Sequence, residues 1–143
     1  MNNTTIRTEL VTRLTQWAEH PIQFYGYPDD GDVETAKANG NPWVTCILRP
    51  APAANTSIGS GPQPRRPGVL MLQVFVKPKS FGELEAGASP ESLESLGIAD
   101  SLTAHMENRR LNGVVTDAAN VIVVGEQDGW WQLNVNIPYR TTI

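Results

Sequence analysis

The sequence has few of the residues on which catalysis and covalent cross-linking depend. Its 143 residues include one cysteine, Cys46, and two histidines, so no disulfide can close within the chain and a cysteine-rich zinc site is excluded. Neither His20 nor His105 has another ligand-type residue at metal-binding spacing in a predicted element, and neither accompanies a nucleophile motif. We therefore expect no catalytic residue, no metal and no cofactor, and a protein that is not an enzyme.

Charge and long apolar runs are also scarce. Charged residues make up 18% of the chain and its formal net charge is -4, which argues against a dominant basic surface for gripping nucleic acid. No run approaches the roughly 18 apolar residues of a membrane span, and the first residues lack a secretory signal pattern. With 40% hydrophobic residues, the chain can bury a core. We expect one domain over residues 1–143, made in a cytoplasm and without membrane contact.

Hydrophobic periodicity predicts two helices and four strands. Apolar residues spaced by three or four positions predict helices over 4–19 and about 93–110. The first stripe is Ile6, Leu10, Leu14 and Trp17, and the second is Leu93, Leu96, Ala99, Leu102 and Met106. Strands are predicted over 43–49, 69–76, 114–125 and 130–140. The fold class is thus α+β, in the order α-β-β-α-β-β, with one four-stranded, mostly antiparallel sheet and two helices on one face.

The last predicted strand has one apolar and one amide-rich face. Its apolar positions, predicted to face inward, are Trp131, Leu133, Val135, Ile137 and Tyr139. Gln132, Asn134 and Asn136 alternate with them. Uncharged amides suit a contact between subunits that must tolerate water before assembly, although an ordinary solvent face fits the same pattern. We predict a subunit or partner interface formed by Trp130, Gln132, Asn134, Asn136 and Arg140.

The strand over 69–76, VLMLQVFV, is apolar at nearly every position. Such a strand is typical of the centre of a sheet that is covered on both faces. Helices of the same chain can cover one face. We expect a neighbouring subunit to cover the other.

Two segments are rich in turn-forming residues. Residues 50–68 contain five prolines and three glycines, which predicts a mobile loop, and Arg65 and Arg66 near its end form a paired positive charge that could dock on an acidic partner surface. Residues 26–41 predict a surface connection. Its acids are most simply a solvated loop, with a metal- or ligand-binding site over 29–34 as the alternative. They are Asp29, Asp30, Asp32 and Glu34.

Four stretches together resemble one family. They are WVTCILRP, RRPGVLMLQVFVKP, ADSLTAHMENRRLNG and VGEQDGWWQLNVNIPYR. In their order and spacing the chain resembles bacteriophage tail terminator-like proteins from about residue 4 to residue 140. The likeness is one of whole-chain pattern and includes no catalytic signature. The loops over 26–41 and 81–90 depart from it, so partner contacts made there do not carry over.

The resemblance implies a structural virion protein. Such a protein forms a homohexameric ring that caps the tail tube, ends tail polymerisation and presents the surface for head–tail joining. Its implied partners are further copies of itself, the tail tube protein, the neck or head-completion connector protein and, in a contractile tail, the sheath protein. The genome would pass through the ring without specific binding. The implied location is the head-proximal end of the virion tail, after assembly in the host bacterial cytoplasm.

Three other interpretations remain open at this point. The chain could be another phage neck or connector component. It could be a small α+β ligand-binding or enzyme domain that uses the acids of residues 29–34. It could also be a nucleic-acid module that uses Arg65, Arg66, Arg109 and Arg110.

Overall fold

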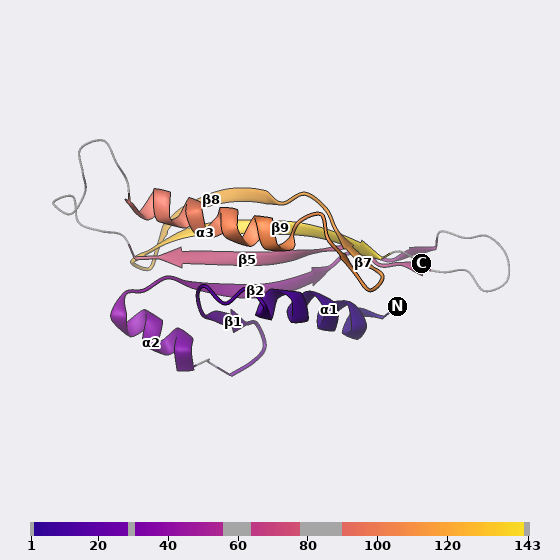
Figure 1. Ribbon diagram of the computed structural model, residues 1–143, viewed down its shortest axis with the longest axis horizontal. Helices are drawn as coiled ribbons and strands as arrows, with labels where there is room; N and C mark the ends of the chain where they lie inside the picture. Colours follow the sequence, from indigo (N-terminus) through magenta and orange to yellow (C-terminus); the bar gives the residue numbers. More distant parts are fainter. Residues whose placement is uncertain (1, 29–30, 56–63, 78–89, 142–143) are drawn as a thin grey trace.

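The computed structural model describes residues 2–28, 31–55, 64–77 and 90–141. These residues form one mixed α/β domain with three helices and an open seven-stranded sheet (Figure 1). The helices are α1 (Asn3–Thr15), α2 (Gly31–Asn39) and α3 (Pro90–Met106). The strands are β1 (Ile22–Phe24), β2 (Trp43–Pro50), β3 (Ala54–Asn55), β4 (Pro64–Arg65), β5 (Gly68–Val76), β6 (Arg110–Leu111), β7 (Val114–Thr116), β8 (Asn120–Gln127) and β9 (Trp130–Thr141).

The main sheet has the order β1-β2-β5-β9-β7-β6, and β8 pairs with β9 beside this path. Only the β1–β2 pair is parallel. The prediction of a single domain with both helices and strands is confirmed. The prediction of four strands in the order α-β-β-α-β-β is wrong, because the sheet contains additional short strands and α2 lies between the first two.

The predicted strand over 114–125 is two strands. Strand β7 pairs with the end of β9, where Thr116 lies opposite Tyr139, and β8 pairs with the first part of β9, where Asn120 lies opposite Asn136. The connection between them is held by the Asp117 amide, which donates to the carbonyl of Pro138 at 2.8 Å. The long strand β9 thus pairs with two shorter strands in succession along one of its edges.

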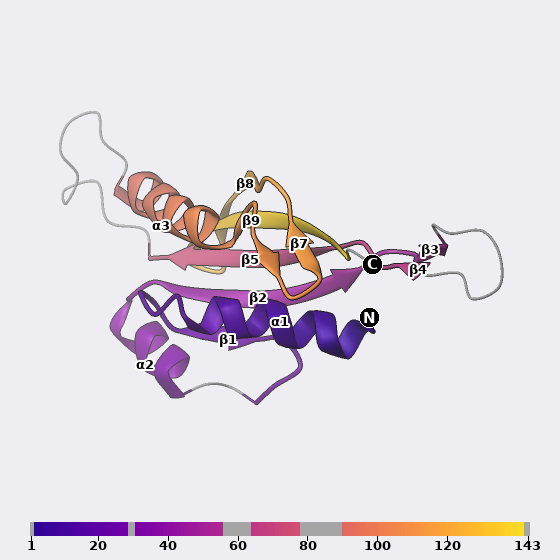
Figure 2. The ribbon, with the colours of Figure 1, turned by 45° about the vertical axis from the view of Figure 1, so that its right-hand side comes forward.

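Helices α1 and α3 pack on one face of the sheet, as predicted (Figure 2). We call this face the helix side. Asn2 caps the start of α1, because its side chain accepts the Thr5 amide at 2.8 Å, and the helix ends at Thr15 rather than at residue 19. Trp17 nevertheless stays in the core, and its indole nitrogen donates to the Ser101 hydroxyl of α3 at 2.9 Å.

A second link joins the C-terminal ends of the two helices. Arg13 Nε donates to the carbonyl of His105 at 3.0 Å, and His105 Nε2 lies 2.6 Å from the carbonyl of Arg13. Since a carbonyl only accepts, His105 carries its proton on Nε2. This histidine therefore locks two helices together.

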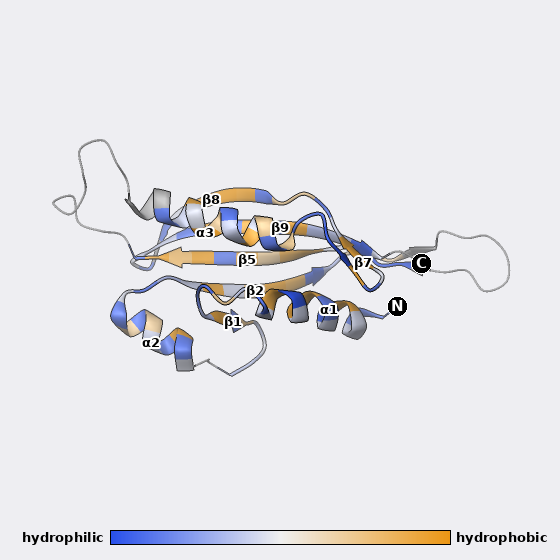
Figure 3. Cartoon of the chain, viewed as in Figure 1, coloured by the Kyte–Doolittle hydropathy of each residue, from blue (hydrophilic) through white to orange (hydrophobic). Residues whose placement is uncertain are grey.

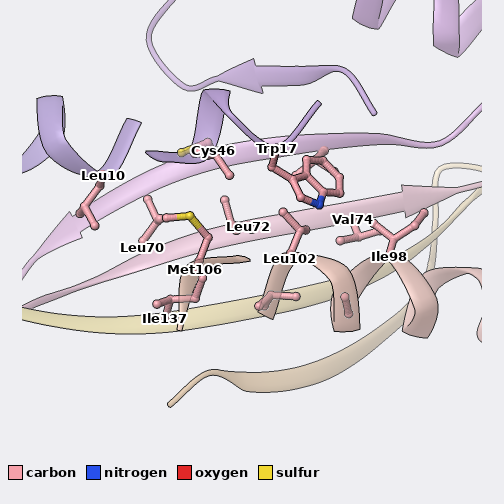
Figure 4. Close-up of a cluster of buried hydrophobic side chains, with 14 of the residues drawn as sticks. Leu10, Trp17, Cys46, Leu70, Leu72, Val74, Ile98, Leu102, Met106 and Ile137 are labelled. Atoms are coloured by element: carbon pink, nitrogen blue, oxygen red, sulfur yellow. The ribbon is translucent and has the colours of Figure 1, made fainter. Parts of the chain in front are cut away.

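The core lies between these helices and the central strands (Figure 4). Alternate residues of β9 are fully buried, so the predicted inward face is confirmed at Leu133, Val135, Ile137 and Tyr139, whereas Trp131 is half-buried. In α3, Ile98 is buried but Leu96 is 40% exposed. The predicted stripe was wrong at Leu96 because the helix is rotated so that Ser95, Ile98 and Ala99 face the sheet. None of the helices in the described ranges is long and apolar enough to cross a membrane.

Strand β5 is central, but its two faces differ. Leu70, Leu72 and Val74 are buried on the helix side, while Met71, Gln73 and Phe75 between them are half-buried. The prediction that both faces are covered therefore holds within this chain only for the helix side. The sequence of β5 did not show this alternation of buried and half-buried residues, because most residues on its second face are also apolar.

Gly68 allows β5 and β9 to approach each other closely. It lies opposite Tyr139 in the register, and a Cβ atom at Gly68 would overlap the hydroxyl end of Tyr139 and lie 2.8 Å from the carbonyl of Arg49. The fold depends on glycine at this point because the tyrosine ring covers the space that a side chain would need.

The substitution Gly68→Ala should therefore lower the free energy of unfolding by about 1–3 kcal/mol, the usual cost of overpacking. Gly97→Ala is the matched control, since no heavy atom lies within 4 Å of the position that the added methyl group would take. In the interior of a helix it should raise stability by up to about 1 kcal/mol. Urea denaturation measures both changes, and equal effects of the two substitutions would contradict the close approach.

Candidate interaction surface

The face of the sheet opposite α1 and α3 is built from half-buried side chains, and we call it the open face. The register aligns Thr45, Gln73 and Asn134 in one row across β2, β5 and β9. A second row contains Ile47, Met71 and Asn136. A polar row thus lies beside a mixed row on a surface that is neither a core nor a fully hydrated exterior.

Hydrogen bonds order the polar row. The Thr45 hydroxyl donates to Gln73 Oε1 at 2.7 Å, and Gln132 Nε2 donates to Asn134 Oδ1 at 2.9 Å. Asn136 Oδ1 is shielded from solvent and has no hydrogen-bond partner among the described residues. Since a shielded acceptor without a donor is unfavourable, this oxygen lowers the stability of the open face within the chain.

Helix α2 covers one end of the open face. Val33 and Ala36 pack on Trp43, whose ring stacks on Phe75 at 4.2 Å and meets Trp130 edge-on at 5.9 Å. Trp130 is therefore half-buried within the chain's own second core. The Lys37 ammonium lies 4.3 Å from the Trp43 ring centre and holds the helix against it.

This helix corrects the prediction of a surface loop over 26–41. Asp32 and Glu34 lie in its first turn, where carboxylates stabilise the helix through its dipole. Asp29 and Asp30 lie outside the described residues. Within the described ranges no three His, Cys, Asp or Glu side chains are grouped closely enough to hold a metal ion.

Strand β8 is coloured hydrophobic over much of its length (Figure 3), and it contains the longest run of exposed large apolar residues in the described ranges. Val121, Ile122, Val123 and Val124 are 42%, 49%, 58% and 40% exposed. Successive residues of a strand point to opposite faces, so both faces of β8 are uncovered. Among the described residues β8 pairs with β9 alone, which leaves its outer backbone edge open. Long apolar edge strands of this kind pair readily with another chain.

The predicted loop over 50–68 is ordered at both ends. Pro50 lies opposite Gly68 at the end of the β2–β5 ladder, and β3 pairs with β4 beyond it. Figure 2 shows this two-stranded ladder projecting past the end of the sheet. Residues 56–63 lie outside the described ranges, so the predicted mobility of the tip is untested.

The predicted interface arginines lie in different settings. Arg65 is exposed in β4, and the amide of Arg66 donates to the Thr141 hydroxyl at 3.1 Å. Arg140 lies 3.4 Å from Asp117 in an ion pair in which both side chains are about half exposed; such pairs contribute little to stability. The structure brings Gln132, Asn134 and Asn136 together on the open face, with Trp130 at the edge of the α2 contact.

Two hollows lie near α1. A cleft of about 820 Å³ is lined by Glu19, His20 and Pro21 together with Asp32 and Thr35 of α2. A smaller groove of about 210 Å³ lies between α1 and the β1–β2 edge, and Leu10, Cys46 and Leu70 form its buried floor. No pattern in the sequence indicated either hollow, because each forms from segments distant along the chain.

No family model matches the chain, and no curated protein matches it. A solved structure whose name states no function is similar over 100% of this chain and 97% of that chain, with a TM-score of 0.66 and 15% sequence identity. At this identity the likeness shows the fold alone. The full length of the chain thus belongs to one architecture that also occurs in another protein.

Burial raises the pKa of the Cys46 thiol from 9.0 to about 12, and the nearby Arg7 charge opposes this shift only in part. The folded state therefore favours the neutral thiol. Below pH 9.0 the thiol is protonated in both folded and unfolded chains. Above pH 9.0 the unfolded thiol loses its proton first, so the stability that comes from burying a neutral thiol falls until the pH passes about 12.

We predict that the free energy of unfolding of the wild type falls faster with pH above 9.0 than that of Cys46→Ala. The difference in slope should approach about 1.4 kcal/mol for each pH unit. Urea denaturation over this pH range measures it, and the alanine variant removes the contributions of tyrosines and lysines that both proteins share. Parallel pH profiles would show that Cys46 titrates normally in the folded chain.

Proposed function

We propose that this protein is a structural virion component that assembles into a ring, caps the phage tail tube and forms the head–tail joining surface. The observation that carries the proposal is β8, an edge strand with four consecutive exposed aliphatic residues that no described residue covers on either face. A monomer that keeps such an edge exposed risks aggregation. A protomer that buries it in a closed assembly does not.

Two further features support an assembly role. The open face carries half-buried Ile47 and Met71 beside ordered amides, a mixture typical of interfaces between subunits that also exist separately. The whole-chain resemblance to tail terminator-like proteins supplies the particular assembly. Its implied partners are the tail tube, the neck connector and, in a contractile tail, the sheath.

The second candidate is a ligand-binding domain. The cleft of about 820 Å³ beside α2 brings Glu19, His20 and Asp32 to one hollow, and clefts of this size accept small ligands. This candidate differs from the ring because it gives β8 no function and leaves its exposed aliphatic residues unexplained.

The first prediction from the proposed function concerns tail length. Tails assembled without the protein should vary in length and fail to join heads, whereas tails assembled with it should end uniformly and carry a ring at the head-proximal end. Electron microscopy of purified tails measures both properties. Uniform tails that join heads normally in its absence would contradict the role.

The second prediction concerns the open face. Asn134→Lys combined with Asn136→Lys places two charges among half-buried side chains, so we expect weaker association with subunits or tail tubes while the monomer stays folded. Asn3→Lys combined with Asn39→Lys, at exposed helix positions, adds the same charge elsewhere and should have no effect. Co-sedimentation with tail tubes and sedimentation velocity of the isolated protein report the two kinds of contact. Equal association of both double variants would remove the open face from the interface.

A further inference from the structure

The helix side of β8 carries two valines and an acid. The register places Val121 opposite Val135, Val123 opposite Leu133 and Glu126 opposite Trp131. A bulge between Val123 and Gly125 shifts the spacing, so that all three side chains share the face toward which β9 points its core residues. Glu126 is exposed and forms no ion pair with any described residue. This strand thus offers an apolar stripe that ends in an unpaired negative charge.

The groove at the other edge of the sheet has the complementary character. Val11, Leu48 and Tyr25 form walls above its buried floor, and Tyr25 is 76% exposed. Arg7 also lines the groove. Its guanidinium lies 4.9 Å from the Tyr27 ring centre and has no carboxylate partner within the described ranges. The groove is therefore an apolar slot beside a positive charge that this chain leaves unpaired in the part described.

We propose that β8 of one copy of this chain docks into the groove between α1 and the β1–β2 edge of the next copy. Val121 and Val123 lie against the apolar walls, and Glu126 pairs with Arg7. The inference deepens the proposed function, on which it rests, by naming the two surfaces through which the ring closes. Charge complementarity selects a second copy as the occupant, because the acid and the arginine, neither of them ion-paired with a described residue, belong to the same chain.

The positions of the two surfaces decide the kind of assembly. Strand β8 lies beyond β9 and the groove lies at the β1–β2 edge, so the two surfaces are at opposite edges of the sheet. Figure 1 shows β8 and β1 on opposite sides of the central strands. The two valines and Glu126 of β8 face the helix side, where the groove also lies. A contact between different surfaces is heterologous, so an open series of copies keeps one unused surface at each of its two ends until the rotation closes it into a ring. Pairing of β8 with β8 would be isologous and would stop at a dimer. The proposed contact therefore yields a ring or an extended series.

Charge reversal tests the contact. Arg7→Glu and Glu126→Arg should each raise the concentration needed for assembly by about tenfold or more, because every contact then opposes two like charges in a partly desolvated site. Both side chains lie outside the buried core, so circular dichroism should show unchanged folding. Asp100→Arg, at an exposed position of α3, changes the net charge by the same amount as Glu126→Arg does, so it is the control for that variant and should assemble as the wild type does.

Mixing the two single variants gives the decisive result. In an alternating assembly, the reversed strand of Glu126→Arg meets the reversed groove of Arg7→Glu, and the two native surfaces meet at the next contact. Equimolar mixing should thus restore assemblies that neither variant forms alone, as measured by light scattering after size-exclusion chromatography. Assembly of either variant alone at the wild-type concentration, or failure of the mixture, overturns the proposed contact.

The outcomes separate this inference from the proposed function. If the wild type forms rings and neither charge reversal affects them, the proposed function stands and the proposed contact is wrong. If the wild type remains monomeric, both alone and with tail tubes, the proposed function and the proposed contact are both wrong. A discrete dimer that is weakened by Glu126→Arg but not by Arg7→Glu would indicate β8–β8 pairing. Co-purification only with a different protein would indicate that β8 binds that protein instead of a second copy. Either outcome also overturns the inference.

Discussion

The structure depends on strand β9 being paired along both edges while its two faces meet different environments. Along one edge it pairs with β5 from Gly68↔Tyr139 to Val76↔Trp131, and along the other with β7 and β8 in succession. On the helix side its aliphatic residues complete the core beneath α1 and α3. On the open face its amides continue rows that start on β2 and β5. A shift of one residue in its register would exchange these two faces.

This division explains why the chain has surfaces that it does not cover itself. Two helices are enough to bury the helix side over β2, β5 and β9, and α2 is short enough to cover only the end of the open face around Trp43. Strand β8 lies beyond the reach of this packing and exposes its aliphatic residues. Exposing an apolar edge and a half-buried face to water is unfavourable for a monomer, whereas a protomer can bury both against its neighbours. The fold is therefore consistent with the proposed assembly.

Parts of this arrangement followed from the sequence because local patterns encode them. Strict alternation predicted the buried face of β9, and helical spacing predicted α1 and most of α3. Helix α2 was missed because its sequence, GDVETAKAN, combines turn-forming residues with only two buried positions, Val33 and Ala36. The break between β7 and β8 depends on which part of β9 each strand pairs with, and no local pattern encodes it. The alternation of β5 was hidden by apolar residues on its open face.

Less of the candidate site than of the fold could be predicted from the sequence, because the site depends on residues that are distant along the chain. The amides of β9 were visible as a pattern, but the residues that lie beside them on the open face, and the shielding of the Asn136 oxygen, depend on cross-strand register. The groove beside Arg7 joins residues of α1, β2 and β5 with Tyr25, and its relation to β8 exists only in three dimensions. Charge alone did not distinguish Arg7 from Arg65 or Arg66. Its place in the lining of an apolar groove does.

The central claim is that β8 and the α1 groove are two halves of one contact between copies. Hydrogen–deuterium exchange of the wild type, compared between dilute and concentrated solutions, tests it most directly. The account predicts that assembly slows exchange both in β8 (Asn120–Gln127) and in the segments around Val11 and Tyr25, to the same extent and over the same concentration range. Protection of β8 without protection of the groove, or of neither, would contradict it.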